Sequence, residues 1–139
     1  MENNQENKID FKDAKYATGR RKKSIAKVWL KKGTGKISVN GKNIDVYFKR
    51  ANHIMQILRP LEIINQSTEY DVKSNVVGGG LTGQAGALVH GISRALLQFD
   101  ENYKPTLRKE KLTTRDSRSV ERKKPGRAKA RKSYQFSKR

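Results

Sequence analysis

Basic side chains are the groups in this sequence whose type and spacing point most directly to chemistry. Arg20, Arg21, Lys22 and Lys23 are consecutive and follow Gly19. Lys and Arg neutralise phosphates, so four cations held together where a strand begins or ends would face a phosphate backbone. Taken alone, the run is explained equally well by a strand end that is simply charged and solvated.

The C-terminal segment carries the same chemistry in a stronger form. Residues 123–139 read KKPGRAKARKSYQFSKR, and eight of these seventeen residues are Lys or Arg. Tyr134 and Phe136 are the large apolar side chains of this segment, and both could stack on bases. Ordering a backbone costs roughly 1 to 2 kcal/mol per residue, which so few apolar groups cannot offset, so a partner must order the segment. The segment is predicted to bind nucleic acid, and a tail that only aids solubility is the alternative.

Three glycines have the spacing of a dinucleotide-binding fingerprint. Gly78, Gly80 and Gly83 lie between a predicted strand and a predicted helix. A dinucleotide fold needs several alternating parallel strands and helices, and the elements around these glycines are too few, so no cofactor is expected. A glycine turn still lets another backbone approach, and a helix N-terminus offers free N–H groups. An RNA phosphate bound at Gly79 and Gly80 is therefore one hypothesis, and plain packing of the helix on the sheet is the other.

No group of side chains in the sequence has the composition of an active site or a metal centre. The absence of cysteine excludes disulfides, thiolate catalysis and metals bound by Cys. His53 and His90 have no second His or carboxylate at a ligand spacing, so structural roles are expected for both. Asp116 and Glu121 lie in a basic run and are expected to pair with neighbouring cations. Enzyme function is not expected.

The overall charge favours a polyanionic partner. The 139 residues carry a formal net charge of +19 at pH 7, and most of this excess lies in residues 104–139. Such an excess repels itself unless a polyanion neutralises it, so nucleic acid is the first expected partner and an anionic membrane surface the second. Residues 74–93 are uncharged but include six glycines and several polar side chains, so a buried soluble element is expected there instead of a membrane span. The N-terminal residues resemble neither an export nor an import signal.

Alternating apolar residues predict the strands that would position these groups. Ala26, Val28 and Leu30 recur at every second residue, and glycine-containing turns follow them. Residues 16–39 are therefore predicted to form a small antiparallel meander. The same alternation predicts another strand at residues 70–76.

Apolar spacings of three and four predict the helices. Residues 44–58 are predicted to form one helix, or two helices with a break near Lys49, ending at Pro60. Residues 81–99 are predicted to form a second amphipathic helix. The order of elements predicts an α+β fold, a two-layer body in which helices cover one face of a small, mostly antiparallel sheet.

The chain is predicted to have one globular domain with an extension at each end. Residues 1–14 are an acidic segment that is expected to be disordered, and residues 15–103 are expected to form the body. The apolar periodicity fades after Tyr103, so residues 104–139 are predicted to be an extended basic tail.

Five ordered motifs resemble the family of small-subunit ribosomal protein S nine, of the bacterial type. They are TGRRK at residues 18–22, VVGGGLTGQAGA at 76–87, HGISRAL at 90–96, LTTRDSRSVERKK at 112–124 and QFSKR at 135–139. The resemblance implies an α+β body like the second domain of ribosomal protein S five, seated on ribosomal RNA in the head of the small subunit. It also implies a cytoplasmic location and a tail that threads through RNA and touches the anticodon stem-loop of peptidyl-site transfer RNA.

The resemblance assigns roles to particular positions. Ser137, Lys138 and Arg139 would contact the transfer RNA. The cations that would bind ribosomal RNA are Arg20, Arg21, Lys22, Lys23, Arg115, Arg118, Arg122, Lys123, Lys124, Arg127, Lys129, Arg131 and Lys132. Neighbouring proteins of the subunit head are further expected partners, and a membrane is not. A free nucleic-acid chaperone is the alternative that composition alone would equally allow.

Overall fold

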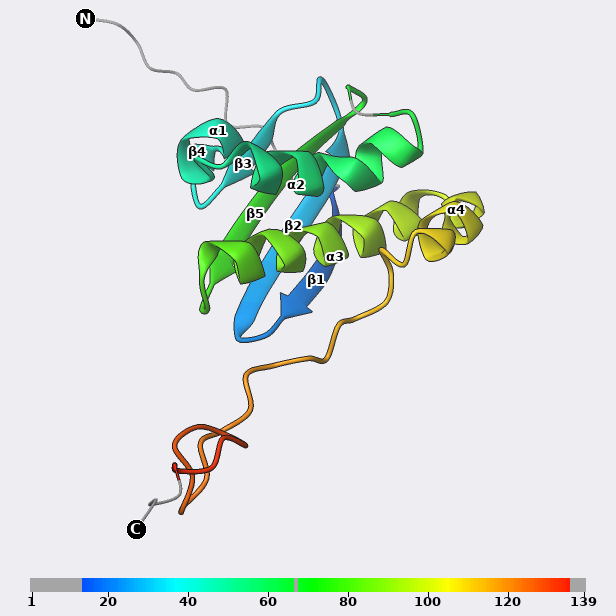
Figure 1. Ribbon diagram of the computed structural model, residues 1–139. Coiled ribbons are helices and arrows are strands. Elements are labelled where there is room, and N and C mark those ends of the chain that lie inside the picture. The colour runs from blue at the N-terminus through cyan, green and yellow to red at the C-terminus, as the bar shows by residue number, and fades with distance from the viewer. Residues whose placement is uncertain (1–13, 67, 136–139) are drawn as a thin grey trace, which may run out of the picture.

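A five-stranded sheet and a set of helices make up two layers of the structure (Figure 1). The computed structural model describes residues 14–66 and 68–135. The strands are β1 (Lys15–Arg21), β2 (Ser24–Lys32), β3 (Ile37–Val39), β4 (Lys42–Asn43) and β5 (Tyr70–Val77). The helices are α1 (Ile44–Tyr47), α2 (Ala51–Ile63), α3 (Leu81–Phe99), the 3-10 helix η1 (Glu101–Tyr103) and α4 (Lys104–Lys109). The predicted α+β fold is confirmed.

The sheet is mixed, with the strand order β1-β2-β5-β3-β4. The pairs β1/β2, β2/β5 and β3/β4 are antiparallel, whereas β3 runs parallel to β5. The predicted meander is therefore wrong at β3, because β5 lies between β2 and β3. The reason is a side chain in β5: Oδ1 of Asp71 accepts the backbone N–H groups of Thr34, Gly35 and Lys36, which turns the chain away from β2 after it ends.

The apolar alternation of the strands faces the helices. Ala26, Val28 and Leu30 of β2 are fully buried, as the sequence predicts for one face of a half-buried strand. Figure 1 shows α2 and α3 side by side in front of the sheet, with α3 crossing β1 and β2. The core lies between this helical layer and that face of the sheet.

The first helical segment is two helices. Phe48 has an extended backbone and a fully buried ring, which ends α1 and separates it from α2. Of the two alternatives left open by the sequence, the one with a break near Lys49 is present. The prediction that Pro60 ends the helix is wrong, since α2 continues to Ile63. Pro60 lies in the last turn of α2 and is fully buried, so packing offsets the backbone hydrogen bond that proline cannot make.

Helix α3 has the bounds predicted from the sequence and packs very closely on β1. A Cβ placed on Gly19 would lie closer than 3.0 Å to the backbone of Ala87 and of Gly91. Glycine in the strand therefore lets strand and helix backbones meet without a side chain between them. Residues 83–93 of α3 are buried around almost the whole helix.

The packed part of the molecule continues past residue 103. Leu107 of α4 is fully buried in the core, and Leu112 packs against it. From residue 113 to residue 135 the chain forms no helix and no strand apart from a single bridge between Arg127 and Ser133. Figure 1 shows this segment, in orange and red, running away from the body. Within the described residues, no helix has the length and apolar character needed to cross a membrane.

Candidate nucleic-acid interface

The hairpin between β1 and β2 presents the predicted basic run at one end of the sheet. Arg21 is opposite Ser24, so Lys22 and Lys23 alone form the turn. Lys22 has φ 52°, a backbone conformation that a tight turn imposes and that few residues other than glycine adopt. The side chains of Arg20, Lys22 and Lys23 are exposed, and Arg21 is half-buried.

Arg21 lies against α3 and against the chain that follows the body. A Cβ placed on Gly86 would lie closer than 3.0 Å to Cδ of Arg21, so glycine makes room for the arginine stem. Nη2 of Arg21 is 4.0 Å from Oδ2 of Asp116. This side chain therefore links the strand, the helix and the start of the basic C-terminal segment.

The glycine turn, residues 78–80, precedes α3 and packs on the basic turn, which Lys22 and Lys23 form. Gly79 has φ +60°, and a Cβ there would lie closer than 3.0 Å to Oγ of Ser24. A Cβ on Gly78 would approach the carbonyl oxygen of Lys23 just as closely, and Oγ of Ser24 donates a hydrogen bond to the carbonyl of Gly78 at 3.0 Å. Packing is thus one role of these glycines. The two turns form a single surface.

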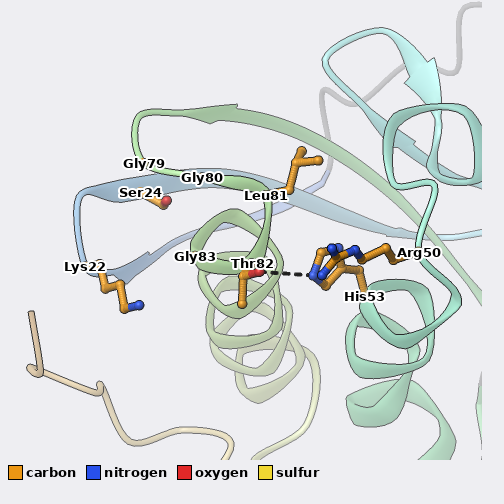
Figure 2. A pocket seen from close by; sticks show the side chains of 9 residues that line it. All are labelled: Lys22, Ser24, Arg50, His53, Gly79, Gly80, Leu81, Thr82 and Gly83. Carbon is orange, nitrogen blue, oxygen red and sulfur yellow. Dashed lines mark hydrogen bonds between the residues drawn. The ribbon is translucent and has the colours of Figure 1, made fainter.

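A pocket of about 380 Å³ lies where this surface meets the start of α2. Its lining residues are Lys22, Ser24, Arg50, His53, Gly79, Gly80, Leu81, Thr82 and Gly83. None of them is acidic, and two carry a positive charge. Figure 2 shows the Lys22 and Arg50 side chains on opposite sides of the first turn of α3. The pocket is therefore suited to an anion.

Arg50, His53 and Thr82 are not among the residues that the sequence predicts to bind RNA, and His53 is expected there to have a structural role. All three come from the starts of α2 and α3, and they meet the basic turn through the tertiary fold alone. A sequence feature that hints at Arg50 is its place just before an apolar helix with no Ser, Thr, Asp or Asn to cap it. The structure thus brings Lys22, Gly79 and Gly80 together, which the sequence does not predict, and adds residues from a third segment.

The basic residues beyond the body form a separate, exposed set. Arg115, Arg118, Arg122, Lys123, Arg127, Lys129, Arg131 and Lys132 are exposed, and Lys124 is half-buried. Asp116 in this segment approaches Arg21 of the basic run. Ser137, Lys138 and Arg139 lie outside the described residues.

Two carboxylates in this segment pair with its cations, as predicted. Asp116 accepts Nη2 of Arg118 at 2.7 Å, and Glu121 accepts Nζ of Lys124 and, at 2.9 Å, Nε of Arg131. Hydrogen bonds from Arg118 hold the pKa of Asp116 far below its usual range, and those from Lys124 and Arg131 lower the pKa of Glu121. Both groups therefore stay ionised and partly neutralise the segment, and Glu121 closes a loop over residues 121–131.

The histidines have structural partners. Nδ1 of His90 accepts the backbone N–H of Arg20 at 3.4 Å. Burial lowers the pKa of His90, as do the charges of Arg94 and Arg115, whereas a hydrogen bond with the backbone of Thr113 raises it. His90 thus joins β1 to the segment after α4 as a neutral ring. Within the described residues there is no cluster of three or more His, Cys, Asp or Glu that could hold a metal ion.

A family model described as ribosomal protein S9/S16 matches residues 19–139. The chain belongs to this family. Membership makes it an RNA-binding protein of the small ribosomal subunit with a role in translation. The match covers the basic turn, the glycine turn and the whole basic C-terminal segment, so the family resemblance found in the sequence is confirmed. The bacterial type stays a prediction.

Proposed function

We propose that this S9/S16 family member is a structural, non-enzymatic constituent that binds small-subunit ribosomal RNA in the subunit head and touches peptidyl-site transfer RNA with its C-terminal end. In this proposal it acts on the cytoplasmic ribosome beside other proteins of the head. The observation that carries it is the joint surface of the basic turn and the glycine turn, where Lys22 and Lys23 are exposed beside a pocket with no acidic lining.

Electrostatics explains why this surface suits RNA. The two turns are locked together by backbone packing, so the cations of residues 20–23 start from a fixed corner of the sheet. Fixed cations neutralise phosphates with little loss of conformational entropy, and each phosphate contact releases counterions. The exposed cations of residues 115–132 extend this binding along a second RNA path.

The contact with transfer RNA rests on the chemistry of the chain end. Lys138 offers a compact ammonium group, Arg139 a planar fork of donors, and Ser137 a neutral hydroxyl. These groups match phosphate oxygens of an anticodon stem. The described part of the segment leads away from the body, which supports a site of action at a distance from it.

Two measurements test the ribosomal RNA part of the proposal. The protein should remain with small subunits through a high-salt wash and sedimentation. Binding to isolated small-subunit ribosomal RNA should weaken as the salt concentration rises. The slope of log K against log salt should become shallower by about 0.7 to 0.9 for each phosphate contact that is removed. Lys22→Gln with Lys23→Gln should therefore flatten the slope by one to two, on the order given by that relation.

The matched control is Lys36→Gln with Lys42→Gln. It removes the same charge from exposed positions by β3 and β4, at the opposite edge of the sheet. A slope that falls equally in both double variants would show that net charge alone binds the RNA, and that the basic turn is no specific contact.

A further inference from the structure

We propose that the pocket between the starts of α2 and α3 seats one backbone phosphate of an RNA strand. This inference rests on the proposed ribosomal RNA binding and names the group that is bound at one point of it. The seat adds Arg50, His53 and Thr82 to the RNA-binding residues, and none of these follows from the basic motifs.

The open end of α3 supplies the first half of the seat. The helix has 19 residues, and its N-cap residue is Gly80. No side chain therefore caps the first N–H groups of the helix by a hydrogen bond from this position. The first N–H groups of a helix have no partner within it, and the aligned peptide dipoles place about half a positive charge there. Phosphates bind at such helix ends in many folds.

A buried histidine supplies an independent observation. His53 is 7% exposed, and its Nε2 lies 3.2 Å from Oγ1 of Thr82 in the first turn of α3. Its Nδ1 is the single buried side-chain nitrogen or oxygen without a hydrogen-bond partner in residues 14–66 and 68–135. Buried polar atoms are almost always satisfied. Figure 2 shows the ring pointing from α2 toward Thr82, so the wall of the pocket contains a buried polar side chain whose second nitrogen has no hydrogen-bond partner.

Charges from two other segments complete the seat. Arg50 directly precedes α2, which also begins without a side-chain cap, and Lys22 comes from the β1–β2 turn. Two uncapped helix starts and two cations therefore converge where no carboxylate is present. The positive charge continues outside the pocket through Arg20 and Lys23, which are exposed, and this extended pattern suits a polymer of phosphates better than one free anion.

The fold does not require a glycine at position 80, the N-cap of α3. Its φ of -102° and ψ of 174° are those of an ordinary helix cap, and a Cβ placed there would meet no atom within 4 Å. Asp, Asn or Ser would stabilise the helix at such a position. With glycine, the first N–H groups of α3 instead remain open toward the pocket, as a bound phosphate requires.

The test compares Gly80→Asp and Gly80→Asn with wild type. Both variants cap α3, so the melting temperature should stay equal or rise, but the aspartate also puts a negative charge in the seat. Affinity for isolated small-subunit ribosomal RNA should fall about tenfold or more for Gly80→Asp, as for the loss of one charge-assisted contact, and less for Gly80→Asn. The salt slope should fall by about one. Arg50→Gln should weaken binding in the same direction.

Asn43→Asp is the control, because Asn43 is exposed in β4, at the edge of the sheet opposite β1, has an ordinary extended backbone, and gains the same negative charge in this variant. RNA affinity that is unchanged in Gly80→Asp, or reduced equally in Asn43→Asp, would overturn the proposal. If these results occur while truncation of residues 123–139 still weakens RNA binding, only the phosphate seat fails. If truncation has no effect either, the proposed function fails with it.

A titration with inorganic phosphate distinguishes a pocket for a free anion from a pocket for an RNA phosphate. Titration with it should shift the amide resonances of residues 80–83 in wild type and not in Gly80→Asp. Shifts without any change of RNA affinity in the variant would assign the pocket to a free anion and overturn the RNA proposal. Weakened subunit assembly with intact RNA affinity would assign the pocket to an acidic group of a neighbouring protein, which also overturns it.

Discussion

A single carboxylate fixes the course of the chain between β2 and β3. Asp71 is 5% exposed, and its Oδ1 accepts the N–H groups of Thr34, Gly35 and Lys36 at 3.0, 2.9 and 2.9 Å. Gly33 has no Cβ that would collide with this carboxylate. The side chain takes the place of a sheet partner for three consecutive donors, so it holds the turn between β2 and β3 against β5.

Removing this carboxylate should cost stability. Asp71→Ala leaves three donors without their charged acceptor and is expected to lower the free energy of unfolding by about 2 to 4 kcal/mol. Asp71→Asn keeps an acceptor oxygen and should cost less. Urea unfolding of the two variants and wild type measures both values. Equal stability of Asp71→Ala and wild type would mean that water satisfies the turn without the side chain.

His90 should make stability depend on pH in a window separate from that of the carboxylates. Burial lowers its pKa in the folded protein, so the unfolded chain takes up the proton first as the pH falls. The contribution of the neutral ring is present above a pH of about 6.5 and is lost as the pH falls through that value toward the folded pKa. The lowered pKa values of Asp116 and Glu121 place their effects at more acidic pH.

His90→Asn isolates this effect. The amide oxygen can accept the N–H of Arg20 but does not titrate, so the variant should lose less stability than wild type between about pH 7.5 and 5.5. Chemical unfolding at the two pH values gives the four free energies required. Parallel losses in both proteins would assign the pH dependence to other groups.

At the scale of elements, β1 and α3 pack backbone against backbone. Gly19 in the strand faces Ala87 and Gly91 in the helix, with no space for a methyl group. This contact also sets the position of the basic residues that follow Gly19 in β1. Strand and helix therefore fix the interface through their packing.

Gly19→Ala is expected to destabilise the protein by about 3 kcal/mol or more, because the clash is with backbone atoms that cannot rotate away. Gly80→Ala is the control, since its methyl group would meet no atom within 4 Å. Thermal or urea unfolding distinguishes the two. Similar stability for both variants would show that α3 shifts away from β1 without loss.

Elements with a strong local pattern could be predicted from the sequence. Helix α3 and strand β5 have the expected bounds to within a residue, because apolar periodicity and the adjacent glycines determine them locally. The parallel pairing of β3 with β5 could not be predicted. The turn that leads into β3 is held by Asp71, which lies more than thirty residues further along the chain.

Some residues of the candidate site could likewise be predicted from the sequence, and others could not. The cations of residues 20–23 and the glycine turn have sequence patterns with a physical meaning of their own, and the structure brings them together. Arg50 and His53 belong to a helix that the sequence predicts for its apolar face, and neither shows any pattern of an anion site. Their role depends on where α2 begins relative to α3, which only the packed core determines.

At the scale of the whole molecule, the packed body and the basic C-terminal segment have different proposed roles in RNA binding. The body holds cations at one end of the sheet, and the chain leaves it after Leu112, which packs on the core. The 27 residues from 113 to 139 could span at most roughly 90 Å at about 3.3 Å per residue, whereas a body near 100 residues has a radius of gyration of about 13 Å. The loop closed by Glu121 shortens this reach, but exposed ion pairs are weak, and RNA phosphates would compete for its cations.

Deleting residues 137–139 should therefore separate assembly from transfer-RNA binding. Small subunits that carry the truncated protein should contain it at normal stoichiometry, because the body and residues 115–132 keep their proposed RNA contacts. Peptidyl-site transfer RNA should dissociate roughly 5 to 30 times faster, since the lost ammonium and guanidinium groups together are worth on the order of 1 to 2 kcal/mol in a wet site. Purified truncated and wild-type subunits, compared for stoichiometry and for the dissociation rate, provide the measurement. Full occupancy with an unchanged rate would contradict the contact, and reduced occupancy would make the end of the chain an assembly element instead.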